Sequence, residues 1–289
     1  MDWPLAVAGL VTGLLVGLTG TGGGALMTPI LTLIFGVPPL AAVSTDLVTG
    51  VFMKPVAVAV HLPRHTIRWR IAGWLCAGSV PAAFAGAVVD GLLGSAGIEQ
   101  VLKLALGATL LVAVASTVVR MYLDLRRGPQ LDTEPEISAV RLAIVGAVVG
   151  FVVGMTSVGS GSLVMVTLLL MYPGLSAGRL VGTDLAQALP LIASAALGHL
   201  LFGQVQFAMV FALLVGAIPG AIAGALLSSR APSRIIRAAL AVVLLSSGLS
   251  LLGAPALVTV AVAVVATGGA VGWLVLAWKS TPTKERDLV

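Results

Sequence analysis

Charged residues are scarce in this sequence, because they make up 9% of its 289 positions, whereas 58% are hydrophobic. Soluble domains carry charge on about a quarter of their residues, so this chain cannot build an ordinary water-exposed surface. The scarcity excludes a soluble enzyme, a disordered chain and a nucleic-acid-binding protein, even though the formal net charge is +5. The composition therefore predicts an all-α polytopic membrane protein.

Cysteine and several recognisable motifs are also lacking. Cys76 is the single cysteine and lies within an apolar segment, which excludes an intramolecular disulfide. The first residues, Met-Asp-Trp-Pro, lack the basic stretch of a cleavable signal peptide, so none is expected. No Gly-x4-Gly-Lys-Ser/Thr motif is present. We therefore expect no ATP hydrolysis by this chain, and neither a cofactor nor a bound metal.

Apolar segments of two lengths make up most of the chain. A helix that crosses the hydrocarbon core needs about 20 apolar residues. Seven segments reach that length: 40–61, 69–91, 98–122, 178–201, 205–228, 234–252 and 255–278. Four shorter segments form two pairs: 4–18 with 24–36, and 139–155 with 162–172. Small residues separate the members of each pair, which favours a re-entrant hairpin with a Gly-rich tip inside the membrane. Two short but complete spans joined by a surface turn are the alternative.

The two halves of the chain repeat the same series of segments, two short and then three long. The residues that recur at a nearly constant separation are Gly22 and Gly159, Asp46 and Asp184, His61 and His199, and Pro81 and Pro219. Because five segments is an odd number, we expect the second copy to be inverted in the membrane. The predicted parts are a first repeat at 1–122, a linker at 123–138, a second repeat at 139–252, and an extra C-terminal transmembrane helix with its tail at 253–289.

The positions of the arginines favour this inversion. The linker after 40–61 contains three arginines, whereas its counterpart at 202–206 contains none. In the next linker the arginines lie in the second half instead, at 230–237. Basic linkers remain in the cytoplasm. We therefore expect a multi-pass protein of the cell membrane, with its N-terminus outside and its C-terminus in the cytoplasm.

Broken helices in inverted repeats are typical of secondary transporters, which bind substrate near the midplane where the repeats meet. The second helix of each hairpin begins at a Gly-rich tip, where unpaired backbone N–H groups and the helix dipole favour an anion. We expect a small anion between the two tips, held by Thr19, Gly20, Thr21, Gly22, Gly23, Gly24, Thr156, Ser157, Gly159, Ser160, Gly161 and Ser162. The alternative is that these glycines only allow helices to pack closely.

Ionisable residues inside the long segments are further candidates, because charge within a membrane is costly. Asp46 and Asp184 occupy corresponding positions and, together with His61 and His199, are candidates for proton coupling. Helix capping and hydrogen bonds between helices are the alternative roles. Lys54 has no counterpart. It is a candidate to contact the anion, to neutralise a carboxylate, or to extend towards the surface.

Several of these motifs resemble the sulfite exporter family called TauE/SafE. They are Gly-x-Thr-Gly-x-Gly-Gly-Gly at 17–24, the residues before Leu47, His-Leu-Pro-Arg-His at 61–65 and Val-Pro-Ala-Ala-Phe-Ala-Gly at 80–86, with partial repeats at 154–161, 182–185, 199–206 and 218–224. The resemblance implies a membrane transporter of sulfite or an organosulfonate. Export by alternating access is the expected activity.

Two other functions stay open for this sequence. An anion channel could use the same site as a carrier. An intramembrane serine hydrolase built on Ser160 and His199 is the remote alternative, but Ser160 corresponds to Gly23 in the other half. We therefore expect a transporter and not an enzyme. The expected partners are the anion and the lipid bilayer, with no nucleic acid, and a homodimer is left open.

Overall fold

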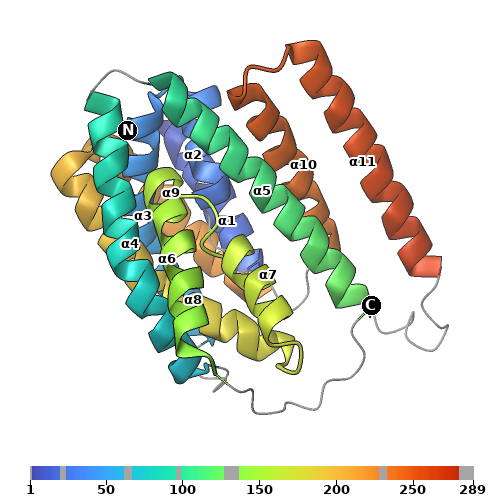
Figure 1. Ribbon diagram of the computed structural model, residues 1–289. Helices are drawn as coiled ribbons and strands as arrows, with labels where there is room; N and C mark the ends of the chain where they lie inside the picture. The colour runs from blue at the N-terminus through green and yellow to red at the C-terminus, as the bar shows by residue number, and fades with distance from the viewer. Residues whose placement is uncertain are drawn as a thin grey trace.

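The fold is helical throughout the described part of the chain. The computed structural model describes residues 2–19, 24–61, 67–95, 99–126, 137–227 and 233–279. These residues form eleven α-helices (Figure 1): α1 (Trp3–Thr19), α2 (Gly24–Leu33), α3 (Pro39–His61), α4 (Trp69–Ser95), α5 (Glu99–Arg126), α6 (Ala139–Thr156), α7 (Ser162–Met171), α8 (Ala177–Phe202), α9 (Phe207–Leu227), α10 (Ser233–Leu251) and α11 (Ala256–Lys279). The all-α prediction is confirmed.

Five stretches of the described residues are long and apolar enough to cross a membrane. They are Trp69–Gly94, Glu99–Asp124, Ala139–Thr156, Gly178–Phe202 and Phe207–Leu227. Four of them coincide with segments predicted as full spans. The remaining one, α6, matches the predicted short segment 139–155 and extends it by one residue, to 18 residues, which reaches the length of a candidate span. These spans identify a multi-pass membrane protein.

Three other predicted full spans fall short of this criterion within the described residues. The apolar parts of α10 and α11 are shorter there, at Ile235–Leu251 and Ala256–Gly269. Helix α3 is long enough but carries Asp46 and Lys54, and it is not among the five. Its charged side chains lie in the protein interior, where 2% of Asp46 and 4% of Lys54 is exposed. The low hydropathy of α3 therefore comes from charged side chains that are buried among the other helices.

Two extended helix contacts organise the bundle: α1 packs along α9, and α4 packs along α6. Glycines on each helix face the backbone of its partner. A Cβ atom at Gly13 of α1 would overlap the carbonyl oxygen of Ala217 in α9, and one at Gly150 of α6 would overlap that of Ser79 in α4. Small residues at such contacts let helix backbones approach closely in a membrane.

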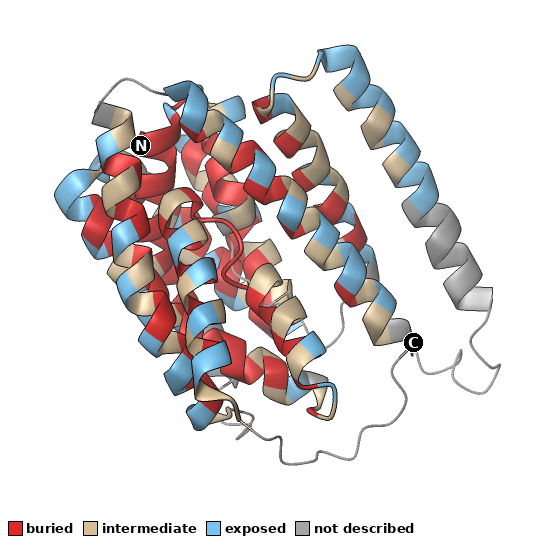
Figure 2. Cartoon of the chain, viewed as in Figure 1, coloured by how far each residue is buried: buried red, intermediate tan, exposed pale blue. Residues whose placement is uncertain are grey.

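The remaining helices pack around these two pairs. Helix α3 contacts α8 and α9, α4 contacts α8, and α5 lies along α10. The buried side chains are concentrated in the bundle, whereas α11 stands at its edge against α10 (Figure 2). Most of Leu257, Val260 and Val264 on α11 is exposed. These apolar side chains are suited to contact with lipid.

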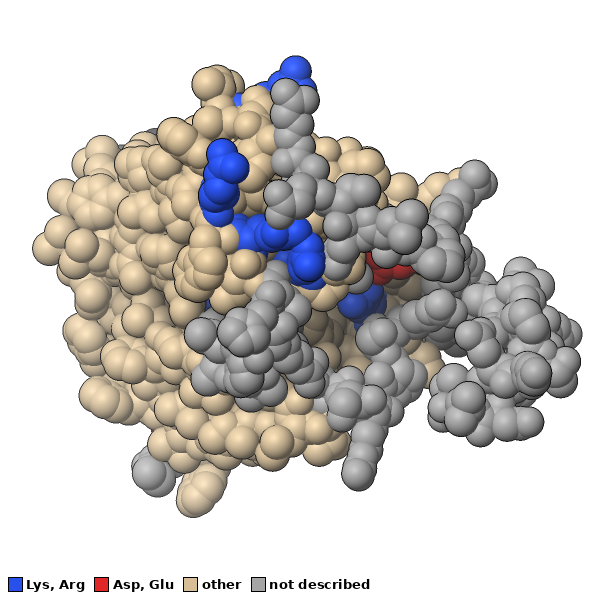
Figure 3. Space-filling model, turned by 90° about the horizontal axis from the view of Figure 1, so that it is seen from below, with Lys and Arg blue, Asp and Glu red and all other residues tan. Residues whose placement is uncertain are grey.

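Charged side chains occupy little of the surface seen from below in Figure 3. The lysines and arginines visible there gather near the middle of that face and along one edge. Uncharged residues make up most of the described surface on that face. Basic side chains on this end of the bundle agree with an end that faces water.

Candidate functional site

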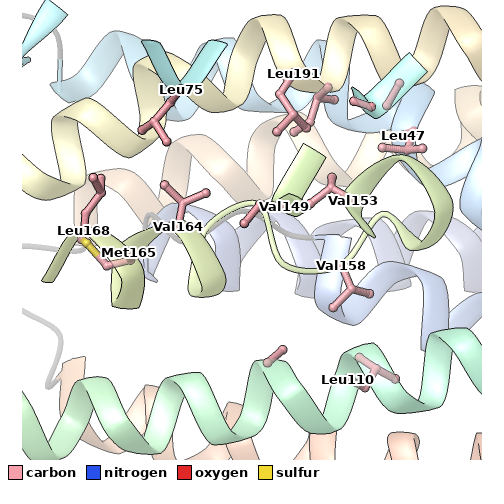
Figure 4. Packing of buried hydrophobic residues seen from close by; sticks show 14 of the residues in the cluster. Leu47, Leu75, Leu110, Val149, Val153, Val158, Val164, Met165, Leu168 and Leu191 are labelled. Carbon is pink, nitrogen blue, oxygen red and sulfur yellow. The ribbon is translucent and has the colours of Figure 1, made fainter. Parts of the chain in front are cut away.

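The turn between α6 and α7 lies inside the protein. Residues 157–161 are all buried. Figure 4 shows Val158 on the side of this turn that faces Leu110 of α5. Irregular backbone at membrane depth is tolerated where protein surrounds it. Burial of the whole turn within the protein agrees with the predicted re-entrant hairpin, and we refer to residues 157–161 as the buried tip.

Two residues with positive φ angles produce the break between α6 and α7. Ser157 has a φ of 59° and its backbone N–H donates to the carbonyl oxygen of Val153, which closes the last turn of α6. Gly159 has a φ of 107°, a conformation that favours glycine because it has no Cβ atom. Helix α7 then begins at Ser162. The Gly-rich sequence thus determines where the helix ends and where the next one starts.

The corresponding turn of the first half lies largely outside the described residues. This applies to the predicted site residues Gly20, Thr21, Gly22 and Gly23. Their neighbours are described, since Thr19 ends α1 and Gly24 begins α2. The structure therefore describes the end of α1 and the start of α2 on either side of this turn.

Asp46 connects three elements. Its Oδ2 atom accepts hydrogen bonds from Thr28 Oγ1 of α2 at 2.7 Å and from Ser157 Oγ of the buried tip at 2.8 Å. Ser157 is itself 4% exposed. The carboxylate thus joins α2, α3 and the buried tip within the core.

Lys54 contacts the same tip two turns further along α3. Its Nζ atom donates a hydrogen bond of 2.8 Å to Ser160 Oγ. Lys54 also interacts electrostatically with Asp46 and Asp184. A buried ammonium group needs both acceptors and opposite charge nearby, and these three residues supply them.

Two of the three predicted threonines of the tips, Thr19 and Thr156, have local partners, and Thr21 lies outside the described residues. Thr19 Oγ1 donates to the carbonyl oxygen of Leu15, and Thr156 Oγ1 donates to that of Val152, both at 2.7 Å. Each hydroxyl therefore donates to a carbonyl of its own helix. Ser162, by contrast, lines a cavity described below.

Asp184 lies on α8 and has fewer hydrogen bonds to described residues than Asp46 has. It is 3% exposed, and its Oδ1 atom has no hydrogen-bond partner among the described residues. The adjacent Thr183 Oγ1 accepts a hydrogen bond from the backbone N–H of Arg68 at 3.0 Å. In the first half, Thr45 Oγ1 accepts one from the backbone N–H of Gln206 at 3.2 Å.

His199 is completely buried near the end of α8. Its Nε2 atom donates to the carbonyl oxygen of Gly154 at 2.8 Å, and its Nδ1 atom lies 2.8 Å from Ser44 Oγ. Asp90 Oδ2 is 3.9 Å from Nε2. The side chain of its counterpart His61 lies outside the described residues, although its backbone ends α3.

The proposed hydrolase pair does not form a hydrogen bond in the structure. Ser160 accepts from Lys54, and His199 contacts Ser44 and Gly154 instead. Nucleophilic catalysis by serine needs a base within hydrogen-bond reach of its hydroxyl. The arrangement thus offers no support for the hydrolase.

A cavity of about 50 Å³ lies between the ends of the two hairpins. From the first half it is lined by Thr19 at the end of α1 and by Ala25 and Leu26 at the start of α2. From the second half it is lined by Gly159, Gly161 and Ser162. The structure therefore brings predicted site residues of both halves to one cavity.

Two arginines that the sequence hypothesis did not include line the same cavity. They are Arg120 of α5 and Arg237 of α10. Arg237 Nη1 donates to Asp124 Oδ2 at 3.1 Å, and Arg120 Nε lies 3.9 Å from the same oxygen. The signal for Arg120 was its position inside the predicted span 98–122. Arg237 belongs to the basic linker at 230–237, from which the sequence assigns the orientation.

The chain is similar to known membrane proteins over most of its length. Residues 5–251 match the family described as sulfite exporter TauE/SafE. The chain is 37% identical over 257 residues to the "Probable membrane transporter protein YjnA" of Bacillus subtilis (strain 168), which covers 87% of this chain and 100% of the relative. It is 24% identical over 199 residues to the "Probable membrane transporter protein YdhB" of the same organism, with 68% and 78% covered. No solved structure shows a significant match to the chain.

Proposed function

Because this chain belongs to the sulfite exporter TauE/SafE family of membrane transporters, we propose that it is a secondary transporter that exports a small sulfur-containing anion, either sulfite or an organosulfonate. The anion binds between the two Gly-rich tips and crosses by alternating access. The observation that carries this proposal is the cavity that Thr19, Ala25, Gly159, Gly161 and Ser162 line together.

The start of α7 supports an anion as the ligand. The first N–H groups of a helix have no acceptor within it, and the helix dipole places partial positive charge there. Gly161 precedes Ser162 at this end, and both residues line the cavity. Glycine leaves room for a ligand close to the backbone. We assign the same role in the first half to Gly22, Gly23 and Gly24, with Thr21 as an additional donor.

An inverted repeat is the architecture that we propose for this mechanism. Two features support it. Each helix contact between the halves has a counterpart in which the two halves change places. Helix α1 packs on α9 as α6 packs on α4, and α3 contacts α9 as α8 contacts α4. Two hydrogen bonds between the halves correspond in the same way. Thr45 accepts from the backbone N–H of Gln206, and Thr183 accepts from the backbone N–H of Arg68. These pairs agree with the repeat boundaries 1–122 and 139–252.

The orientation that we propose follows from the basic linkers, with the N-terminus outside and the C-terminus in the cytoplasm. The basic residues gathered on one face in Figure 3 agree with a cytoplasmic end. The membrane potential assists export of an anion in either orientation of the protein. An inside-negative potential drives each negative charge outward by about 2.3 kcal/mol per 100 mV.

Proton coupling is the finer part of the proposal. Asp46 and Asp184 are the primary candidates, and His61 and His199 remain candidates for relay. The contacts distinguish the two carboxylates: Asp46 Oδ2 accepts two hydroxyl hydrogen bonds, whereas Asp184 Oδ1 accepts none from the described residues. Asp184 is therefore the carboxylate that can take up a proton without breaking the contacts that hold the buried tip.

Transport by purified protein in liposomes tests the proposal. Sulfite and taurine are to be measured in separate flux assays, with empty liposomes as the control. Preloaded vesicles that accelerate uptake of labelled anion by counterflow indicate a carrier, whereas a channel gives flux that does not saturate. Flux equal to that of empty liposomes for both anions would refute the proposed substrates while leaving the family assignment untouched.

A further inference from the structure

The cavity of the proposed anion site has one wall with two guanidinium groups. Arg120 of α5 and Arg237 of α10 both line it, together with Gly159 and Gly161 of the buried tip. Arg120 is 5% exposed, and the side chain of Arg237 is 19% exposed. Both groups are therefore largely removed from water, where a charge must find opposite charge or hydrogen-bond acceptors.

A single neighbouring carboxylate only partly satisfies these two groups. Asp124 Oδ2 accepts from Arg237 Nη1 at 3.1 Å and lies 3.9 Å from Arg120 Nε, which is too long for a hydrogen bond. The Nε atom of Arg237 is buried and has no hydrogen-bond partner among the described residues. Asp184 interacts with Arg120 electrostatically. A guanidinium group has five N–H donors, so Asp124 alone leaves donors available at the cavity.

Together these contacts resemble an anion site occupied by an internal substitute. The guanidinium fork matches two oxygens of an oxyanion, and the carboxylate of Asp124 supplies such oxygens from within the chain. An anion that enters the cavity would meet the same two arginines together with the backbone of the buried tip. Competition between the carboxylate of Asp124 and the anion then determines how strongly the two arginines bind the anion.

The size of the cavity limits which anion can occupy it. A single water molecule needs about 10–15 Å³ of such a cavity. A volume of about 50 Å³ therefore holds on the order of four non-hydrogen atoms, the number in sulfite. An organosulfonate carries a carbon chain beyond its sulfonate group and would need room beyond this volume.

We propose that Arg120 and Arg237 bind the oxygens of an inorganic oxyanion the size of sulfite, and that Asp124 is the internal competitor that the anion displaces. This inference rests on the proposed function, because it assigns residues and a substrate class to the same site. It adds side-chain ligands from α5 and α10 to the backbone ligands of the tips.

Sulfite binding to the purified full-length protein, measured by calorimetry in detergent with sulfate as a second probe, tests this assignment. We expect Arg120→Gln and Arg237→Gln each to weaken sulfite binding about tenfold or more, since each removes charge-assisted hydrogen bonds. Arg141→Gln is the matched control, because Arg141 is an exposed arginine on α6 that does not line the cavity. It should bind as the parent does.

Asp124→Asn separates this assignment from a loss of folding. Removal of the competing charge should tighten sulfite binding several-fold, a gain that misfolding cannot produce. The inference is overturned if both glutamine variants bind sulfite as tightly as the parent, or if Asp124→Asn weakens binding in a protein of unchanged thermal stability. In either case a parent protein that still transports sulfite would leave the proposed function standing. A parent that neither binds nor transports sulfite refutes both.

Discussion

Lys54 Nζ on α3 donates a hydrogen bond of 2.8 Å to Ser160 Oγ in the buried tip, so a charge from the first half of the chain fixes a turn of the second half. Two turns earlier on α3, Asp46 fixes Ser157 in the same tip. The position of the tip therefore depends on the packing of α3. A displacement of α3 within the bundle would be transmitted directly to the residues that line the cavity.

The Lys54–Ser160 contact should be measurable as a coupling energy. Ser160→Ala leaves a buried ammonium group without its acceptor and should lower the free energy of unfolding by about 1.5–3 kcal/mol. Lys54→Met removes the charge together with its need for an acceptor, so Ser160→Ala should cost much less in that background. Thermal unfolding of the four proteins gives the coupling. Additive effects would show that the hydrogen bond contributes nothing to stability.

The contact between α1 and α9 should not tolerate a methyl group. A Cβ atom at Gly13 would overlap the carbonyl oxygen of Ala217, so Gly13→Ala should lower the free energy of unfolding by about 1–3 kcal/mol. Gly73→Ala is the matched control in α4, because a Cβ atom there meets nothing within 4 Å. The control should leave stability unchanged or raise it by about 0.5–1 kcal/mol. Equal thermal stability of the two variants would contradict the close contact.

Substitutions in the buried tip should reduce anion binding more than substitutions of its hydroxyl groups. Gly161→Val places a branched side chain at the cavity wall and should abolish sulfite binding. Ser162→Ala removes at most one donor and should weaken binding less than tenfold. Calorimetry on monodisperse protein makes the comparison. If the valine variant binds sulfite like the parent, the tip is a packing element and the anion binds elsewhere, with Lys54 as the next candidate.

The two buried carboxylates should respond differently to neutral substitution. Asp184→Asn should remove the dependence of sulfite flux on an imposed pH gradient while leaving the buried tip in place. Asp46→Asn weakens the hydrogen bonds from Thr28 and Ser157, so it should lower thermal stability by the equivalent of about 1–3 kcal/mol. Flux in liposomes with and without a pH gradient measures the first effect. A parent protein that is indifferent to the gradient would exclude proton coupling.

The inverted repeat predicts a pattern of accessibility. In a Cys76→Ala background, single cysteines at Arg68 and Arg234 should react with an impermeant maleimide from the cytoplasmic side. A cysteine at Ala256, where α11 begins, should react from the outside. Labelling of intact cells and of inverted vesicles distinguishes the sides. Reaction of the Arg68 and Arg234 positions from opposite sides would rule out the inversion.

Segment lengths and composition were sufficient to predict the helical fold. Apolar segments of membrane length coincide with helices in the structure, because hydrocarbon forces the backbone to satisfy its own hydrogen bonds. The predicted segment 139–155 and helix α6 agree to within one residue. The positive φ of Ser157, which ends this helix, is not reported by hydropathy.

The partners of the buried polar residues could not be predicted from the sequence. Asp46 bonds to Ser157, which lies 111 residues away along the chain, and His199 lies near Ser44, 155 residues away. Such contacts depend on which face each helix turns towards its neighbours. Arg120 was overlooked for the same reason, since only the packing of α5 beside α10 brings it to the cavity.

The contact between α1 and α9 also sets the order in which the protein can be completed during synthesis. Helix α1 is synthesised before α9, yet the backbone that covers Gly9, Gly13 and Gly17 belongs to α9. Roughly 200 residues separate these helices, and a ribosome at about 5–20 residues per second needs on the order of 10–40 s to deliver them. Until then, the glycine face of α1 is covered by lipid or by another membrane component. Helix α1 therefore has to remain inserted without its main partner, and closure of the bundle must wait for the synthesis of α9.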